Sequence, residues 1–272
     1  MYDVKFRSKG DASLSARTVA AIKEYGLKAR TLGAMESRGK DGRGNMPGTG
    51  VSFPLLPPPP IFAKHGCGLQ LDHGVFIPFK FMFGDDFTSV PIVEVSQDES
   101  LSPDRNWEIG KAVDVLRYVH LLSINFPLDL LFVCGRLMTT LPWHRSEGYL
   151  VISGGLTVHT FRDWSAWNED TAAPPYVAFH KALVQAIQTP EVCCLFSSIS
   201  IPHCLTPNTS RQPKPRREAL TALTRHPGFR LAHPREEHFT PIYIAAGAGE
   251  VGATRVLDAT YGQVTVAFGI EA

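Results

Sequence analysis

Three histidines that lie far apart along the chain have the surroundings of functional side chains. His73 stands between an acidic residue and a glycine inside the otherwise apolar stretch 68–78. His159 follows the strand-like run 149–153, and His238 lies near the start of a predicted helix. Burying an unused imidazole is costly, whereas near neutral pH an imidazole can exchange a proton or bind a metal. We therefore predict that the three imidazoles converge on one site.

The elements that must position these histidines follow an α/β pattern. Asp11 is a suitable cap for a helix that ends near Tyr25, and Ser102-Pro103 opens a second helix with an apolar stripe at Ile109, Ala112, Val113 and Leu116. The runs 27–32 and 90–96 have the composition of short strands. A strand followed by a helix indicates βαβ winding.

The second half of the chain continues this alternation. Residues 149–153 are predicted to form a buried strand, after which Gly154-Gly155 would turn the chain and place His159 at the carboxyl edge of a sheet, where α/β folds bind ligands. Helices are predicted over 176–187 and 216–225, and a further helix with Pro234 in its first turn. The runs 254–257 and 263–268 have the composition of strands.

Together these elements predict one α/β domain over residues 1–272. We expect three αβα layers around a mixed, mainly parallel central sheet. Three segments depart from this regularity, and all five cysteines lie within them. They are predicted to be irregular insertions, or untranslated sequence read through as protein, at 45–70, 119–146 and 190–213.

Composition narrows the class of partner. The 27 basic and 26 acidic residues nearly cancel, so no overall field favours nucleic acid or an anionic membrane. The apolar window 119–138 approaches the length of a membrane span, but Asn125, Pro127 and Asp129 interrupt it. The charged first ten residues and the odd cysteine count without metal-type spacing favour the cytoplasm.

An aromatic cluster follows His159 closely. Phe161, Trp164 and Trp167 offer enough flat apolar surface to wall a planar substrate. Aromatic residues beside a strand are also common in cores, and the spacing alone leaves both interpretations open.

Three motifs carry a resemblance to a known family. The runs 71–80 (LDHGVFIPFK), 150–162 (LVISGGLTVHTFR) and 233–246 (HPREEHFTPIYIAA) resemble the class III extradiol ring-cleavage dioxygenases, in the branch that includes DOPA 4,5-dioxygenase. The similarity runs in the family's order from about Leu14 to the end of the chain.

The resemblance implies a non-haem Fe(II) or Zn(II) enzyme that opens the ring of a small aromatic diol with O₂. By analogy, His238 would be a metal ligand beside Glu237. His159 would be either a further ligand or the catalytic acid/base, and His73 would be a catalytic residue that binds the substrate hydroxyl or oxygen.

Elementary chemistry agrees with that implication. A catecholate that binds through two oxygens needs a metal with open positions, and a small set of histidine and carboxylate ligands leaves such positions. A histidine can then take the catechol proton and return it later.

The family pattern also begins earlier than this chain does. Family members start with a strand ending in His-Gly-x-Pro and a second strand ending in another metal-binding histidine. The nearest counterpart here is His65-Gly66-Cys67, which lacks the proline. We therefore expect a fold truncated at its amino end, with an incomplete metal site.

Two other functions stay open at this point. The chain could be an inactive truncated relative that binds a partner through a face left bare by the missing strands. Alternatively, Gly247-Ala248-Gly249-Glu250-Val251-Gly252 matches the glycine pattern of nicotinamide-dependent enzymes. That pattern requires a strand before the glycines and a helix after them.

Overall fold

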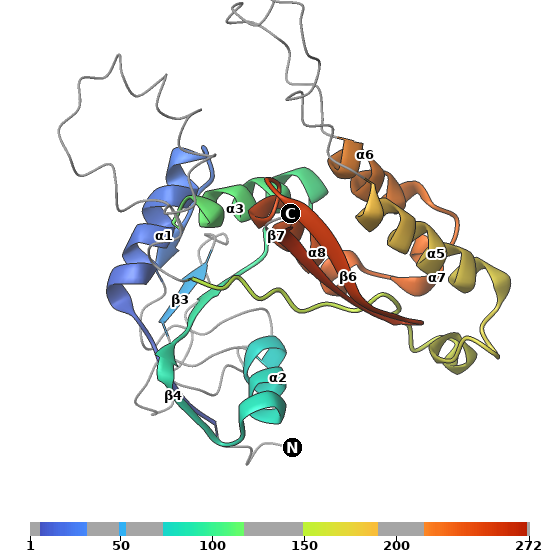
Figure 1. The fold of residues 1–272 in the computed structure, drawn as a ribbon, viewed down its shortest axis with the longest axis horizontal. Coiled ribbons are helices and arrows are strands. Elements are labelled where there is room, and N and C mark those ends of the chain that lie inside the picture. Colours follow the sequence, from blue (N-terminus) through green and yellow to red (C-terminus); the bar gives the residue numbers. More distant parts are fainter. Residues whose placement is uncertain (1–5, 32–48, 53–72, 117–148, 190–214, 271–272) are drawn as a thin grey trace, which may run out of the picture. The chain divides into compact units, whose positions relative to one another are not determined.

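A computed structural model describes residues 6–31, 49–52, 73–116, 149–189 and 215–270 (Figure 1). The chain divides into two compact units, residues 1–154 and 155–272, and each is described by itself. Helices and strands occur in both, which confirms a mixed α/β chain. The predicted single domain stays a prediction.

In the first unit, capping residues define the helices. Helix α1 (Ala12–Glu24) begins where the Asp11 carboxylate accepts a hydrogen bond of 2.9 Å from the backbone N–H of Leu14. The helix ends at Tyr25, and Gly26 follows with a φ of +75°, a conformation that favours glycine. Both predicted ends of this helix are confirmed.

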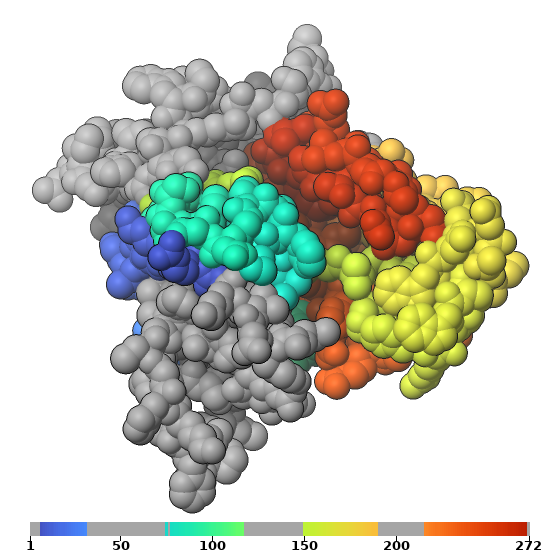
Figure 2. All heavy atoms as spheres, turned by 90° about the horizontal axis from the view of Figure 1, so that it is seen from below, coloured from blue at the N-terminus to red at the C-terminus, as the bar shows by residue number. Residues whose placement is uncertain are grey.

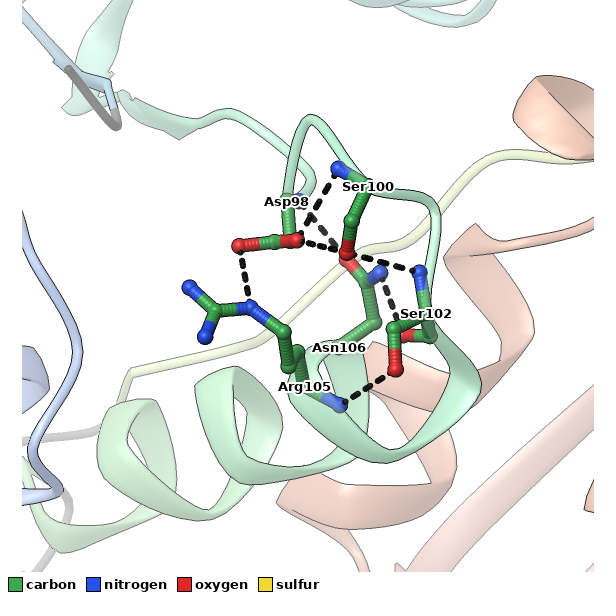
Figure 3. A network of polar contacts seen from close by, with 5 residues as sticks. All are labelled: Asp98, Ser100, Ser102, Arg105 and Asn106. Carbon is green, nitrogen blue, oxygen red and sulfur yellow. Dashed lines mark hydrogen bonds and ion pairs between the residues drawn. The ribbon is translucent and has the colours of Figure 1, made fainter. Parts of the chain in front are cut away.

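Helix α3 (Pro103–Val115) begins at Ser102, as predicted, with Pro103 in its first turn. Figure 3 shows how the preceding loop is tied to this helix. The Asp98 carboxylate accepts from the Ser100 hydroxyl and from Arg105 Nε, and the buried Asn106 side chain accepts from the Asp98 N–H at 2.9 Å. These groups satisfy one another, so we interpret the network as structural.

The strands of the first unit form two small sheets. Strand β1 (Arg7–Lys9) pairs in parallel with β4 (Asp86–Pro91). Strand β3 (Thr49–Ser52) lies between β2 (Arg30–Thr31), which is antiparallel to it, and β5 (Val93–Val95), which is parallel to it. The strand predicted over 27–32 exists as the shorter β2, whereas the run 90–96 is divided between the end of β4 and β5, which belong to different sheets.

Helix α2 (His73–Phe83) packs beside the β1–β4 sheet. The fully buried side chain of Phe6 contacts Val75, Ile77 and Phe79 of this helix. His73 is the first residue of α2, so residues 73–80 of the run 71–80 are helical.

The second unit has a helical layer with an aromatic core. Helix α5 (Pro174–Gln188) packs against α6 (Pro215–Ala222) and α7 (Phe229–Ala232). The short 3₁₀ helices η3 (Trp164–Trp167) and η5 (Leu223–Arg225) complete this part. Buried rings from α5, from α7 with the residue that follows it, and from residues 239–243 meet in the core, namely Phe179, Phe229, His233, Phe239 and Tyr243.

A two-stranded hairpin covers this helical layer. Strands β6 (Ala253–Thr260) and β7 (Gln263–Ile270) correspond to the two strands predicted at the end of the chain, and they pair antiparallel. Helix α5 packs against β6 (Figure 1). The hydroxyl of Tyr261 at the hairpin tip donates a hydrogen bond of 3.1 Å to the Ala166 carbonyl. In Figure 2 the red hairpin accordingly lies beside the yellow residues that precede and form α5.

The strand predicted over residues 149–153 is wrong. This segment belongs to none of the sheets in the described parts of the chain. Burial still alternates along it, with Leu150 81% and Ile152 55% exposed. The sequence pattern reflects an extended backbone, but a strand also needs a neighbour to pair with. The described strands form three small sheets, and a three-layer arrangement around one sheet is not observed.

The helix predicted to start at Pro234 starts seven residues later. A short 3₁₀ turn, η6 (Glu236–His238), precedes helix α8 (Pro241–Ala248), whose first turn contains Pro241. A helix that began at Pro234 would hold Pro241 in its interior, where proline lacks the N–H that the helix requires. His238 therefore lies in the turn before α8.

The nicotinamide-type glycine motif begins with Gly247 in the last turn of helix α8 and ends with Gly252 directly before strand β6. This order is the reverse of the strand–glycine–helix order that places a pyrophosphate at a helix start. The structure therefore removes that alternative.

The three predicted insertions lie outside the described residues, except for β3 at Thr49–Ser52. They stay predictions. Among the helices that the structure does describe, none has the length and apolar character needed to cross a membrane.

Candidate metal centre

The chain around His159 forms neither a helix nor a strand. Its backbone N–H groups therefore form hydrogen bonds with another segment, residues 232–238. The Leu156 N–H donates a hydrogen bond of 2.9 Å to the His238 carbonyl, and the His159 N–H donates one of 2.8 Å to the Ala232 carbonyl. Gly155 approaches the same place, because a Cβ added there would lie 2.7 Å from the His238 carbonyl oxygen. These contacts hold residues 155–159 against residues 232–238.

This contact brings two of the predicted histidines together. The rings of His159 and His238 lie face to face, with centroids 3.7 Å apart and planes inclined by 31°. We call these two side chains the imidazole pair. They come from positions 79 residues apart in the sequence, so only the folded chain makes them neighbours.

Partial desolvation favours the neutral form of the His238 imidazole. Desolvation lowers the pKa of His238, and the nearby His159 ring lowers it further, whereas the Glu237 carboxylate raises it. The nearest Glu237 oxygen lies 3.9 Å from His238 Nε2. Since the neutral ring is the form that binds a metal, His238 can serve as a ligand at a lower pH than an ordinary histidine.

A third histidine, His233, lies fully buried behind this pair. Its Nε2 atom is 2.8 Å from the Thr157 carbonyl oxygen, and its ring packs against Phe229 and Phe239. Desolvation lowers the pKa of His233 to about 4, opposed by the hydrogen bond to Thr157. The sequence interpretation of His233 as a surface or structural residue was wrong about the surface.

This buried histidine predicts a pH-dependent stability. In the unfolded chain a histidine titrates near 6.5, so between pH 6.5 and 4 the unfolded state binds a proton that folded His233 does not. The free energy of unfolding should therefore fall as the pH falls through this window, by roughly 3 kcal/mol from this residue. Denaturant titrations of metal-free protein at a series of pH values measure it.

The matched comparison is His233→Leu against His226→Leu. The former should flatten the acid loss of stability by about 2–3 kcal/mol, and the latter should leave it unchanged. Burial also lowers the pKa values of His180 and His238, so part of the loss persists in both variants. Equal acid slopes in the two variants would show that His233 is not the group responsible.

The aromatic residues next to His159 form an open surface. Phe161 is 63% exposed and Trp164 72% exposed, and the Phe161 ring lies 5.1 Å from the His159 ring. Trp167 is oriented by a hydrogen bond of 2.8 Å from its Nε1 to the Thr160 carbonyl. We call Phe161, Trp164 and Trp167 the aromatic wall. Their exposure favours the substrate-wall interpretation over the core interpretation.

The remaining predicted site residue lies in the other unit. His73 begins helix α2, and its predicted catalytic role stays a prediction. Sequence reasoning did not single out His233, whose distinguishing feature is burial. The signal available was its position in the run 233–246, five residues before His238.

The chemistry of the donors fits a divalent metal, with two imidazoles and an adjacent carboxylate at Glu237. Within the described ranges, no group of three or more histidine, cysteine, aspartate or glutamate side chains is placed to hold a metal ion. The described residues therefore supply part of a ligand set.

Comparison with known proteins points to the same chemistry. No protein-family model matches the chain, and no solved structure matches it. The chain is, however, 32% identical over 271 residues to a 4,5-DOPA dioxygenase extradiol-like protein of Schizosaccharomyces pombe. That relative is an extradiol dioxygenase-like protein, the kind of protein that the three sequence motifs resemble. The predicted resemblance is confirmed.

The alignment covers all of this chain but 63% of the length of that relative. The imidazole pair of this extradiol dioxygenase-like chain lies within the aligned region, as does the aromatic wall. The activity and substrate of the full-length relative do not pass to this chain by similarity alone.

Proposed function

We propose that this chain is a metal-dependent extradiol dioxygenase that opens the ring of a DOPA-like catechol with O₂. The observation that carries the proposal is the imidazole pair, because His159 and His238 meet beside an exposed aromatic wall. The similarity to an extradiol dioxygenase-like relative supports it. The metal would be Fe(II) or Zn(II), which supplies open positions for two catechol oxygens.

The two members of the pair are proposed to have separate roles. His238 would be a metal ligand and His159 the acid/base, in contact with each other at a ring-centroid distance of 3.7 Å. The metal would supply open positions for the substrate oxygens.

The neighbours of each histidine agree with this assignment. Glu237 stands next to His238 and offers a carboxylate oxygen on the same side of the pair. His159 instead neighbours Phe161 and Trp167, where a substrate ring would lie. A histidine between the metal side and the substrate side can take a proton from a catechol hydroxyl. His73 is proposed to bind the substrate hydroxyl or oxygen.

The aromatic wall would position the substrate. Phe161 and Trp164 lie 5.7 Å apart and both face solvent, so a planar ring can pack against them without displacing core side chains. Such a contact orients the catechol while leaving its hydroxyls free.

The remaining parts of the proposal concern the whole enzyme. A small aromatic diol and O₂ would be its substrates, acting in the cytoplasm. The three-layer αβα arrangement around a mainly parallel sheet is proposed for the complete fold, of which the mixed α/β composition is the observed part.

One experiment tests the function directly. The full chain is purified, freed of metal with a chelator, and reloaded without oxygen with Fe(II) or with Zn(II). After DOPA is added, O₂ uptake is followed with an electrode, and labelled O₂ shows whether both oxygen atoms enter the product. Ring-opened product with both labels is expected. Metal binding without O₂ uptake on any of a panel of catechols would contradict the proposal.

Removing part of the aromatic wall should weaken substrate binding. Trp164→Ala is expected to raise the KM for the catechol by about 2–10-fold, the effect of losing one aromatic contact, with a smaller change in kcat. Trp164→Phe should recover most of it, and Leu257→Ala, which removes an exposed apolar side chain on β6, should have no effect. An unchanged KM in Trp164→Ala would remove the wall from the substrate site.

A further inference from the structure

The feature with no role so far is the buried His233 side chain. It is 0% exposed, and its ring lies 5.0 to 5.9 Å from the rings of Phe179, Phe229 and Phe239. An apolar side chain would suit such surroundings better, because a buried polar group is costly unless it is hydrogen-bonded.

Only one half of this imidazole is satisfied. A carbonyl oxygen can only accept, so the contact with Thr157 means that Nε2 carries the proton and donates it. Nδ1 is then a bare acceptor, and it has no hydrogen-bond partner within the described part of the chain. His233 is therefore present for its Nε2 donor, which reaches the segment that carries His159.

That donor completes a series of three hydrogen bonds. Leu156, Thr157 and His159 each contribute one backbone group, bonded to His238, His233 and Ala232 respectively. The bonds from Leu156 and His159 are backbone to backbone, so truncating a side chain does not remove them. The middle bond comes from a side chain.

Few other contacts among the described residues hold residues 156–159 in place. Val158 and Thr160 are buried on either side of His159, although the segment is neither helix nor strand. A further anchor is the Thr157 hydroxyl, which accepts a hydrogen bond of 3.3 Å from the Val264 N–H. Irregular buried backbone depends on such individual bonds, because no ladder or helical turn supplies them.

We propose that His233 is a positioning residue that sets the stacking of the imidazole pair by holding the Thr157 carbonyl. Losing its donor would let residues 156–159 shift and change the direction of the His159 ring relative to His238. The inference rests on the proposed function only for its consequence, metal binding; the stacking itself exists without metal.

The chain offers a matched control in His180. That histidine is also buried, its Nε2 also contacts a carbonyl, that of Ala259 at 3.2 Å, and its Nδ1 also lacks a partner among the described residues. It differs in holding strand β6 instead of the His159 segment. His180→Phe thus reproduces the loss of a buried imidazole donor without touching the imidazole pair.

The test compares wild type, His233→Phe, His233→Gln and His180→Phe as full chains, all confirmed folded by circular dichroism. In metal-free protein with labelled histidine, the nuclear Overhauser effect between the His159 and His238 rings reports the stacking. Co²⁺ titration reports metal affinity. His233→Phe should lose the ring contact and bind Co²⁺ about 10–100-fold more weakly, as substitutions behind metal ligands do. Glutamine, which retains an N–H donor, should restore both, and His180→Phe should change neither.

The outcomes separate the two proposals. An unchanged ring contact in His233→Phe, or an equal loss in His180→Phe, overturns the positioning role. A lost ring contact that glutamine does not restore overturns it too, because packing would then be the cause. If wild type binds no Co²⁺ while the ring contacts respond as expected, the proposed function fails and the positioning role stands.

Discussion

Replacing His238 with alanine is expected to abolish retention of a divalent metal by the purified chain. The imidazole pair and the adjacent Glu237 carboxylate are the groups proposed to hold the metal, and His238 is the member of the pair that we assign as a ligand. Affinity depends on the number of ligands and on their fixed geometry, so losing one should weaken binding by at least ~100-fold. Metal content after dialysis, together with Co²⁺ titration, measures this.

The control for this variant is His226→Ala. His226 is a half-buried histidine of the same unit whose Nδ1 accepts a hydrogen bond of 3.0 Å from the Gly228 N–H. Its loss removes one imidazole elsewhere and should leave metal content at the wild-type value. Equal metal content in His238→Ala and wild type would exclude His238 as a ligand.

His159→Gln is expected to separate turnover from metal binding. If His159 moves the catechol proton, its loss should lower kcat by about 10²–10⁴-fold, the usual contribution of a general acid or base. Glutamine keeps a polar side chain of similar reach but cannot accept and return a proton at neutral pH. Co²⁺ affinity should change by less than ~10-fold, below the range seen when groups behind a ligand are removed.

The opposite pattern would reverse the assignment. If His159→Gln loses metal as completely as His238→Ala does, both imidazoles are ligands and the stacking rearranges on binding. Substrate-dependent O₂ uptake and Co²⁺ titration on the same protein samples distinguish these results.

Local sequence signals predicted those elements whose ends are determined by neighbouring residues. Asp11 and Gly26 delimit α1, and Ser102 with Pro103 begins α3, because caps and prolines act within one helical turn. Strands β6 and β7 were also predicted, from their composition, although their pairing as a hairpin was not.

Prediction failed where a distant partner decides the structure. Residues 149–153 alternate as a strand does, yet no described strand pairs with them. Pro234 and Pro241 are equally suitable for the first turn of a helix. A helix that began at Pro234 would contain Pro241 in its interior, so the helix begins at Pro241. The pairing of β3 with both β2 and β5 likewise depends on chain far away in sequence.

The residue types alone determined the chemistry open to this protein. Histidines at 159 and 238, a glutamate at 237 and three aromatic residues after His159 specify imidazole, carboxylate and planar apolar surface, whatever the fold. Their order along the chain was also sufficient for the family resemblance, which the full-length relative confirms.

Tertiary structure alone decided how those groups meet. It stacked the two imidazoles at 3.7 Å and buried His233 behind them with its donor on the Thr157 carbonyl. Such contacts follow from long-range hydrogen bonds and packing, which have no signature in local spacing because the partners lie more than 70 residues apart.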